Sequence, residues 1–119
     1  SFTLTGNMEC IAYCFHSVSG YSKFGSYTGT GSSQTITTGF QPDWIVTKRT
    51  DTTDNWRMYD SVRQNTQPFD EILYPNLSNA EEDNTTFVTG TTSTGFTLGS
   101  GNGSNASGGT YIYMAFKIN

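Results

Sequence analysis

The feature that most restricts the fold of this chain is a pair of short apolar runs near its middle. Residues 44–49 (WIVTKR) and 55–61 (NWRMYDS) are rich in aromatic and β-branched side chains, and the polar run TDTTD separates them. Such side chains favour the extended backbone of a strand, whereas a short polar run favours a turn. The stretch therefore predicts a β-hairpin, which contains both tryptophans of the chain, Trp44 and Trp56.

Similar short runs recur along the chain, divided by glycine, proline, asparagine and serine residues that favour turns. We expect further strands at residues 8–16, 23–28, 34–38, 85–89, 95–98 and 110–118, and either a strand or one helical turn at 69–74. Residues 77–83 predict a short helix, because Ser78 is followed three residues later by Glu81, as in a capping box. Residues 99–109 (GSGNGSNASGG) predict a loop that is flexible or turns tightly.

These eight or nine strands predict an all-β fold, an antiparallel β-sandwich or jelly roll, in one domain that spans residues 1–119. The first and last long strands are the most apolar. We expect them to lie centrally and to pair with each other, which would bring the termini to one edge or end. The last strand would place Ile112, Met114, Phe116 and Ile118 on one face, and Tyr111, Tyr113, Ala115 and Lys117 on the other.

The charge of the chain argues against two classes of partner. Charged residues make up 13% of the sequence, the six basic residues are scattered, and the formal net charge is −4. Binding to duplex nucleic acid requires clustered lysine and arginine, and an anionic membrane surface is an equally poor partner. No apolar run approaches the roughly 18 residues that span a bilayer. Because the chain begins at Ser1 rather than at methionine, we interpret it as cut or processed from a longer protein.

Two cysteines and a histidine lie in the first predicted strand. Cys10 and Cys14 would be about 13 Å apart along it, at ~3.3 Å per residue, whereas a disulfide requires Cα atoms within about 7 Å. We therefore expect two buried thiols. His16 is the one nearby residue that could complete a zinc site, and no second cysteine pair exists, so we predict no metal site there. No Ser-His-Asp spacing accompanies His16, and we predict no catalytic residue and no cofactor.

The best polar cluster for binding a ligand lies on the second strand of the hairpin and just beyond it. An exposed aromatic ring beside carboxylates and amides is common in sugar sites, because the ring stacks on a pyranose and the carboxylate accepts hydrogen bonds from hydroxyls. The candidate glycan-binding residues are Asp54, Asn55, Trp56, Tyr59, Asp60 and Arg63. In the structural alternative, Trp56 and Met58 face the core, and Asp60 and Arg63 form an ion pair at the strand end.

Other polar segments suggest further contact sites. Asp51 and Asp54, with Asp60 as a third, could provide hard oxygen ligands for calcium, although the spacing of a calcium-binding loop is absent. The acidic run at residues 81–83 predicts a solvated patch, because a glycosidase would need a second carboxylate about 5–9 Å away on an opposing wall. Loops 21–27 and 99–109 are alternative contact surfaces, since tyrosine, serine, glycine and asparagine are common in binding loops.

Five motifs follow one another along nearly the whole chain. They are YCFHSVSGYSKFGSYTGTG (13–31), GFQPDWIVTKRTDTTDNWRMYDSVR (39–63), PNLSNAEED (75–83), GF (95–96) and YIYMAF (111–116). Together they resemble a domain that recurs in tail-fibre and other virion proteins of tailed phages, particularly marine and cyanobacterial phages. Relatives often continue after the last motif, where this sequence ends in KIN.

The resemblance implies a concanavalin-like β-sandwich with a non-enzymatic, structural role. The chain would be part of, or processed from, a virion appendage protein, and its location would be the virion or the extracellular space. It would assemble with copies of itself and with other virion proteins. The alternative is a lectin-like receptor-binding domain that recognises bacterial surface polysaccharide, and one domain can serve both roles.

Overall fold

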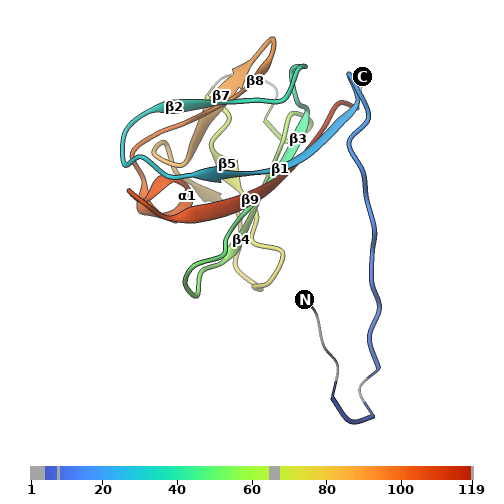
Figure 1. Ribbon diagram of the computed structural model, residues 1–119. Coiled ribbons are helices and arrows are strands. Elements are labelled where there is room, and N and C mark those ends of the chain that lie inside the picture. The colour runs from blue at the N-terminus through green and yellow to red at the C-terminus, as the bar shows by residue number, and fades with distance from the viewer. Residues whose placement is uncertain (1–4, 8, 65–67, 119) are drawn as a thin grey trace.

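The computed structural model describes residues 5–7, 9–64 and 68–118, which form nine strands and one short helix (Figure 1). In chain order these are β1 (Ser22–Thr28), β2 (Gln34–Thr37), β3 (Trp44–Arg49), β4 (Trp56–Asp60), β5 (Glu71–Ile72), β6 (Glu82–Asp83), β7 (Val88–Thr92), β8 (Gly95–Leu98), α1 (Asn102–Asn105) and β9 (Thr110–Phe116). All the strand pairs are antiparallel. The predicted all-β class is confirmed.

The strands form three sheets, of which two make up the body of the domain. We call the four-stranded sheet, in the order β1-β9-β3-β4, sheet A, and the three-stranded sheet, in the order β2-β8-β7, sheet B. The two-residue strands β5 and β6 pair separately, and Leu73 then bridges to Met58 of β4. This arrangement leaves β1 as the edge strand at one side of sheet A.

The hydrophobic core lies between sheets A and B, so the body is built from two packed layers. In sheet A every second residue points inward, because side chains alternate along a strand. The ring of Tyr113 in β9 meets the ring of Phe96 in β8 edge to face, with centroids 5.5 Å apart. Buried residues of this core come from both sheets: Ile45, Tyr59, Tyr113 and Ala115 from sheet A, and Ile36, Val88, Phe96 and Leu98 from sheet B.

The last strand is central, as predicted, and pairs with both β1 and β3. Its predicted alternation is also confirmed over its length: Tyr111, Tyr113 and Ala115 are buried, whereas Ile112, Met114 and Phe116 are more exposed. Gly25 of β1 lies opposite Tyr113, where a Cβ atom would come within 2.8 Å of the tyrosine ring. Glycine at this position therefore lets the large ring enter the core.

The prediction of a first strand at residues 8–16 is wrong for the described residues 9–16, which form no strand and are exposed (Figure 1); Met8 lies outside the described residues. Its expected pairing with the last strand is wrong as well, because β1 and β3 occupy the two sides of β9. The prediction of buried thiols also fails, since Cys10 and Cys14 are exposed. The apolar alternation was real, but no neighbouring strand within the described chain covers it.

The segment between β4 and β8 differs from the prediction in three ways. Residues 77–83 form no helix; Glu82 and Asp83 instead form β6 and pair with β5. The predicted element at 69–74 is a strand of two residues. The strand predicted at 85–89 starts later, at Val88, because the side chain of Asn84 accepts hydrogen bonds from the backbone and hydroxyl of Thr86 and forms a turn.

The glycine-rich loop at 99–109 turns tightly around a buried amide. The side-chain oxygen of Asn105 accepts bonds from the Thr30 N–H at 2.9 Å and from Gln34 at 2.6 Å. Its amide nitrogen donates to the carbonyls of Ser32 and Gly99, both at 2.6 Å. One side chain thus ties α1 to the chain between β1 and β2. Among the described residues, no helix is long and apolar enough to cross a membrane.

Candidate functional site

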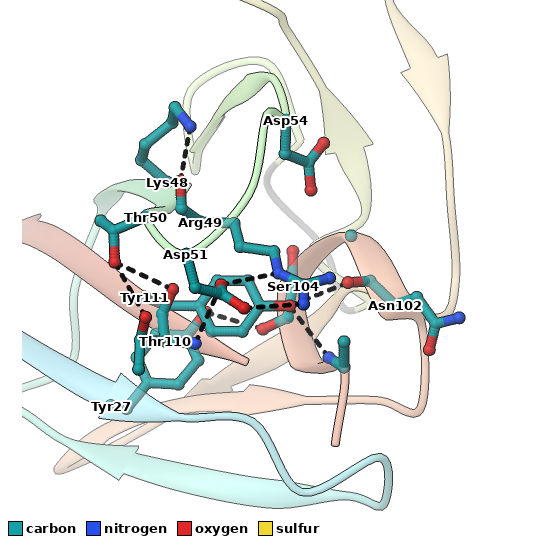
Figure 2. A network of polar contacts seen from close by, with 12 residues as sticks. Tyr27, Lys48, Arg49, Thr50, Asp51, Asp54, Asn102, Ser104, Thr110 and Tyr111 are labelled. Carbon is teal, nitrogen blue, oxygen red and sulfur yellow. Dashed lines mark hydrogen bonds and ion pairs between the residues drawn. The ribbon is translucent and has the colours of Figure 1, made fainter. Parts of the chain in front are cut away.

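Two loops meet where β3 ends and β9 begins, in the polar network drawn in Figure 2. Arg49 donates two hydrogen bonds to the carboxylate of Asp51, at 2.8 and 3.0 Å, and Asp51 also accepts from the backbone N–H of Thr110. The hydroxyls of Thr50 and Thr110 are 3.0 Å apart. The hydrogen bond from Arg49 holds the pKa of Asp51 well below its usual range. This contact closes the end of the sheet.

Two stacked tyrosines continue the network toward α1. The rings of Tyr27 and Tyr111 are parallel, with centroids 4.9 Å apart. The Tyr27 hydroxyl donates to the carbonyl of Ser104, and the Tyr111 hydroxyl donates to that of Asn102, both at 2.8 Å. Burial raises the pKa of Tyr27 above its ordinary value. The Tyr27 hydroxyl is therefore neutral at physiological pH, and the hydroxyls of both tyrosines anchor the helix.

A second ion pair lies deeper, at the start of β4. Arg57 is 6% exposed and donates to the carboxylate of Asp54 at 2.9 Å and to the carbonyl of Gly103 at 2.8 Å. Its guanidinium lies 4.7 Å from the ring centroid of Phe87. Burial lowers the pKa of Arg57, but the hydrogen bond that Arg57 donates to Asp54 and the charge of that carboxylate outweigh burial and leave the pKa raised. Arg57 is therefore a charged residue of the core.

A third ionic cluster lies at the opposite end of β4. Asp60 and Arg63 form the ion pair of the structural alternative, and Arg63 also pairs with Glu81 and donates to the carbonyl of Glu71. Burial raises the pKa of Asp60, but hydrogen bonds from the backbone and guanidinium of Arg63 outweigh it and leave the pKa lowered. This cluster joins the end of β4 to the β5–β6 segment.

The six residues predicted to bind glycan do not converge on one surface. Tyr59 is 1% exposed and packs in the core, so it does not face a ligand outside. Asp60 is the last residue of β4, whereas Asp54 lies two residues before the strand begins, six residues and up to about 20 Å away at ~3.3 Å per residue. Each of the two carboxylates pairs with an arginine. Trp56 is half-buried on the other face of the strand.

Two of the predicted glycan-binding residues, Asn55 and Trp56, lie together at the start of β4 and form a small group with Asn76. The side-chain amide of Asn76 donates to Asn55 at 3.0 Å and accepts from the backbone N–H of Trp56 at 3.0 Å. The inward side of β4 is formed by Arg57 and Tyr59, so the expectation that Trp56 and Met58 face the core is wrong. The sequence predicts the position of the hairpin correctly. It predicts the wrong inward side for the second strand, because a buried arginine is not expected from the pattern.

The carboxylates considered for calcium are already neutralised. Asp51 pairs with Arg49, Asp54 with Arg57, and Asp60 with Arg63. Within the described residues there is no group of three or more histidine, cysteine, aspartate or glutamate side chains that could hold a metal ion. The acidic run at 81–83 is exposed, as expected, although Glu81 pairs with Arg63 and Glu82 accepts a hydrogen bond from Tyr74.

The face of sheet A that points away from the core is unusually apolar, and we call it the outer face. The register places side chains from all four strands on it in neighbouring rows. Its large apolar members are Phe24, Trp44, Val46, Trp56, Met58, Ile112, Met114 and Phe116. All of them except Val46 are half-buried or exposed. Aromatic residues and methionine are enriched at the centres of protein interfaces, so this face has the composition of a contact surface.

One end of the outer face is hollowed. An open, apolar depression of about 390 Å³ is lined by Trp44, Phe116, Lys117 and Ile118. The rings of Trp44 and Phe116, which both line it, have centroids 5.3 Å apart. We call this depression the hollow.

Beside the hollow, the chain enters the domain through an extended segment, residues 9–16, which we call the arm (Figure 1). At its root, the ring of Phe15 stacks on Phe24 at 5.5 Å and meets Phe116 edge to face at 6.4 Å. The rest of the arm leads away from the sheets.

Trp56 is the one large apolar residue of the outer face that was among the site residues predicted from the sequence, and none of the arm residues was. A signal was present: the non-core positions of the last strand are Ile112, Met114 and Phe116, where a solvent-facing strand would alternate with polar residues. The apolar alternation of the arm was a signal of the same kind. A strand that is apolar on both faces is typical of one covered on both sides, but the pattern does not say whether the cover belongs to the same molecule.

The comparisons with known proteins give a family and no activity. A family model described as a domain of unknown function, DUF7483, matches residues 2–119. No curated protein matches the chain. No solved structure matches it either.

Proposed function

Since the chain belongs to the DUF7483 family, whose description assigns no activity, we propose a function from the geometry: the domain is a non-enzymatic structural module that self-associates. We further propose, from the motif resemblance, that it helps to build a tail fibre or another exposed appendage of a phage virion. The supporting observation is the apolar outer face of sheet A, where seven large side chains from four strands remain partly accessible.

The composition of this face supports association rather than catalysis. A monomeric soluble protein rarely exposes a contiguous apolar patch of more than a few hundred Å², and larger patches mark interaction sites. The strongest ionic groups of the described chain support a structural role, because Asp51, Asp54 and Asp60 are each held by an arginine. Their charges are taken up by contacts within the domain.

Light scattering of the purified chain over a concentration series tests self-association. We expect the mean mass to rise above 13.0 kDa toward that of a dimer or a larger assembly. A mass that stays at the monomer value at every concentration would contradict this proposal. Labelling of intact phage particles with an antibody raised against the domain tests the virion assignment, and the absence of label on any appendage would count against it.

A lectin-like role is the second candidate, and the group of Asn55, Trp56 and Asn76 favours it. The half-buried Trp56 follows Asn55 in the chain, and its backbone N–H bonds to Asn76. The side-chain amides of Asn55 and Asn76 are oriented by their mutual hydrogen bond. This arrangement suits stacking on a sugar, with the amides bonding its hydroxyls. Binding of host polysaccharide should be lost in Trp56→Ala and retained in Trp44→Phe; equal binding by both variants and the wild type would refute a role for this group.

A further inference from the structure

The arm has the side-chain pattern of a strand without a strand's neighbours. Ile11, Tyr13 and Phe15 are 78%, 79% and 61% exposed, and alternate residues of an extended chain point to the same side. The arm therefore presents a row of three large apolar side chains, of which the outer two lie almost entirely in solvent. Such a row is unfavourable in water and typical of a segment that binds a surface.

The arm already shows which kind of surface accepts this row. Phe15, its innermost member, packs against Phe24 and Phe116 at the rim of the outer face. Phe116 also lines the hollow, whose other apolar lining residues are Trp44 and Ile118. The row and the hollow thus have the same chemistry, and each leaves apolar area uncovered.

Local hydrogen bonds direct the arm away from its own sheet. Val18 and Ser22 form a single antiparallel pair, after which side chains replace the backbone ladder. The Ser17 hydroxyl accepts from the Phe24 N–H at 3.1 Å, and the Ser22 hydroxyl donates to the His16 carbonyl at 3.2 Å. The hairpin therefore ends after one pair, and the arm diverges from β1 (Figure 1).

These observations lead to one partner. We propose that the arm of one copy docks on the outer face of a second copy, with Ile11 and Tyr13 covering the hollow formed by Trp44, Phe116 and Ile118. Because each copy carries both an arm and a hollow, two copies can exchange arms around a twofold axis, which gives a closed, isologous dimer. This inference rests on the self-association proposed above and specifies which residues produce it.

The first test removes the row without touching the fold. We expect the double variant Ile11→Ser with Tyr13→Ser to raise the dissociation constant of the assembly by about tenfold or more, measured by sedimentation velocity. The matched control is Cys10→Ser with Ala12→Ser, which changes the opposite side of the same arm and should assemble like the wild type. Unchanged assembly of the Ile11/Tyr13 variant would overturn the inference while leaving self-association standing.

The second test asks whether arm and hollow meet in different molecules. Ile118→Ser alters an exposed side chain at the rim of the hollow, and we expect this variant alone to assemble weakly. Mixed with the Ile11/Tyr13 variant, it should form a heterodimer that contains one intact arm and one intact hollow, with an affinity between those of the wild type and either variant. Failure of the mixture to associate more tightly than the separate variants would refute docking between copies.

The two tests separate this inference from the proposed function. A wild-type chain that remains monomeric would end both. A wild-type chain that assembles and whose arm variant also assembles would end the arm-exchange inference alone. Arms that fold onto their own hollow would give a monomer in which acrylamide fails to quench Trp44, and this outcome would also refute exchange.

Discussion

Removal of the Asp54 carboxylate is the sharpest test of how the polar interior stabilises the fold. In Asp54→Ala, the guanidinium of Arg57 stays buried but loses the partner that accepts its Nη2 hydrogen bond at 2.9 Å. Loss of a hydrogen bond to a charged group costs about 1.5–3 kcal/mol, and loss of one partner of a fully buried pair costs about 3–5 kcal/mol.

The environment of the pair decides where in this range the effect lies. The carboxylate of Asp54 is 18% exposed, so water screens part of the charge. Arg57 also keeps its bond to the Gly103 carbonyl and its contact with the Phe87 ring. We therefore expect Asp54→Ala to lower the free energy of unfolding by about 2–3 kcal/mol, a large share of the total for a domain of this size. Asp54→Asn, which keeps an acceptor oxygen, should lose less.

Urea denaturation followed by tryptophan fluorescence measures this change, with Asp51→Ala as the matched control. The Arg49–Asp51 pair has similar geometry but is more exposed, with side chains 21% and 36% accessible, and more exposed pairs contribute less. The expected order of stability is wild type, Asp51→Ala, Asp54→Asn, Asp54→Ala. If Asp54→Ala and Asp51→Ala lower the free energy of unfolding by the same amount, burial of Arg57 does not set the strength of its ion pair, and this prediction is refuted.

Three further predictions follow from the same structure. Asn105→Ala leaves the carbonyls of two loops unpaired and should cost about 3–4 kcal/mol in urea denaturation, whereas the exposed neighbour Asn102→Ala should cost little; equal losses would contradict the assigned role of the amide. Both thiols, Cys10 and Cys14, should react with a disulfide reagent in the native protein at low concentration as fast as in urea, and protection of either would contradict their exposure. The pKa of Asp54 lies below its ordinary 3.8 in the folded state. The stabilising effect of its carboxylate is therefore present above about pH 4 and is lost as the pH falls through the lower folded value. The melting temperature of the wild type should fall with acid more steeply than that of Asp54→Ala, and parallel curves would refute this linkage.

The strands that the sequence predicted best are those in which local preference and tertiary environment agree. The aromatic and β-branched runs of β3 and β8 have the predicted bounds, and β9 has the predicted alternation. In each case the turn residues beside the strand restrict its register, and the buried side chains are apolar. The segment 77–83 failed because a capping pattern describes a possible helix start, whereas pairing with β5 decides the conformation of Glu82 and Asp83.

The candidate site was less predictable because it depends on which face of each strand is covered. In β4 the sequence offers Trp56 and Met58 as the apolar side, but the core takes Arg57 and Tyr59. The reason is long-range: the carbonyl of Gly103 and the carboxylate of Asp54 satisfy the guanidinium, and Phe87 packs on it. Once Arg57 points inward, alternation places the tryptophan and methionine on the outer face, where they contribute to the proposed contact surface.

Hydroxyl-radical footprinting of the arm over a concentration series tests the central claim most directly, because it reports the solvent exposure of individual side chains. We expect Tyr13 to be oxidised rapidly in dilute protein and to become protected as the assembly forms, while the exposed Leu77 stays reactive throughout. Oxidation of Tyr13 at a constant, rapid rate in both the dilute and the assembled protein would contradict it.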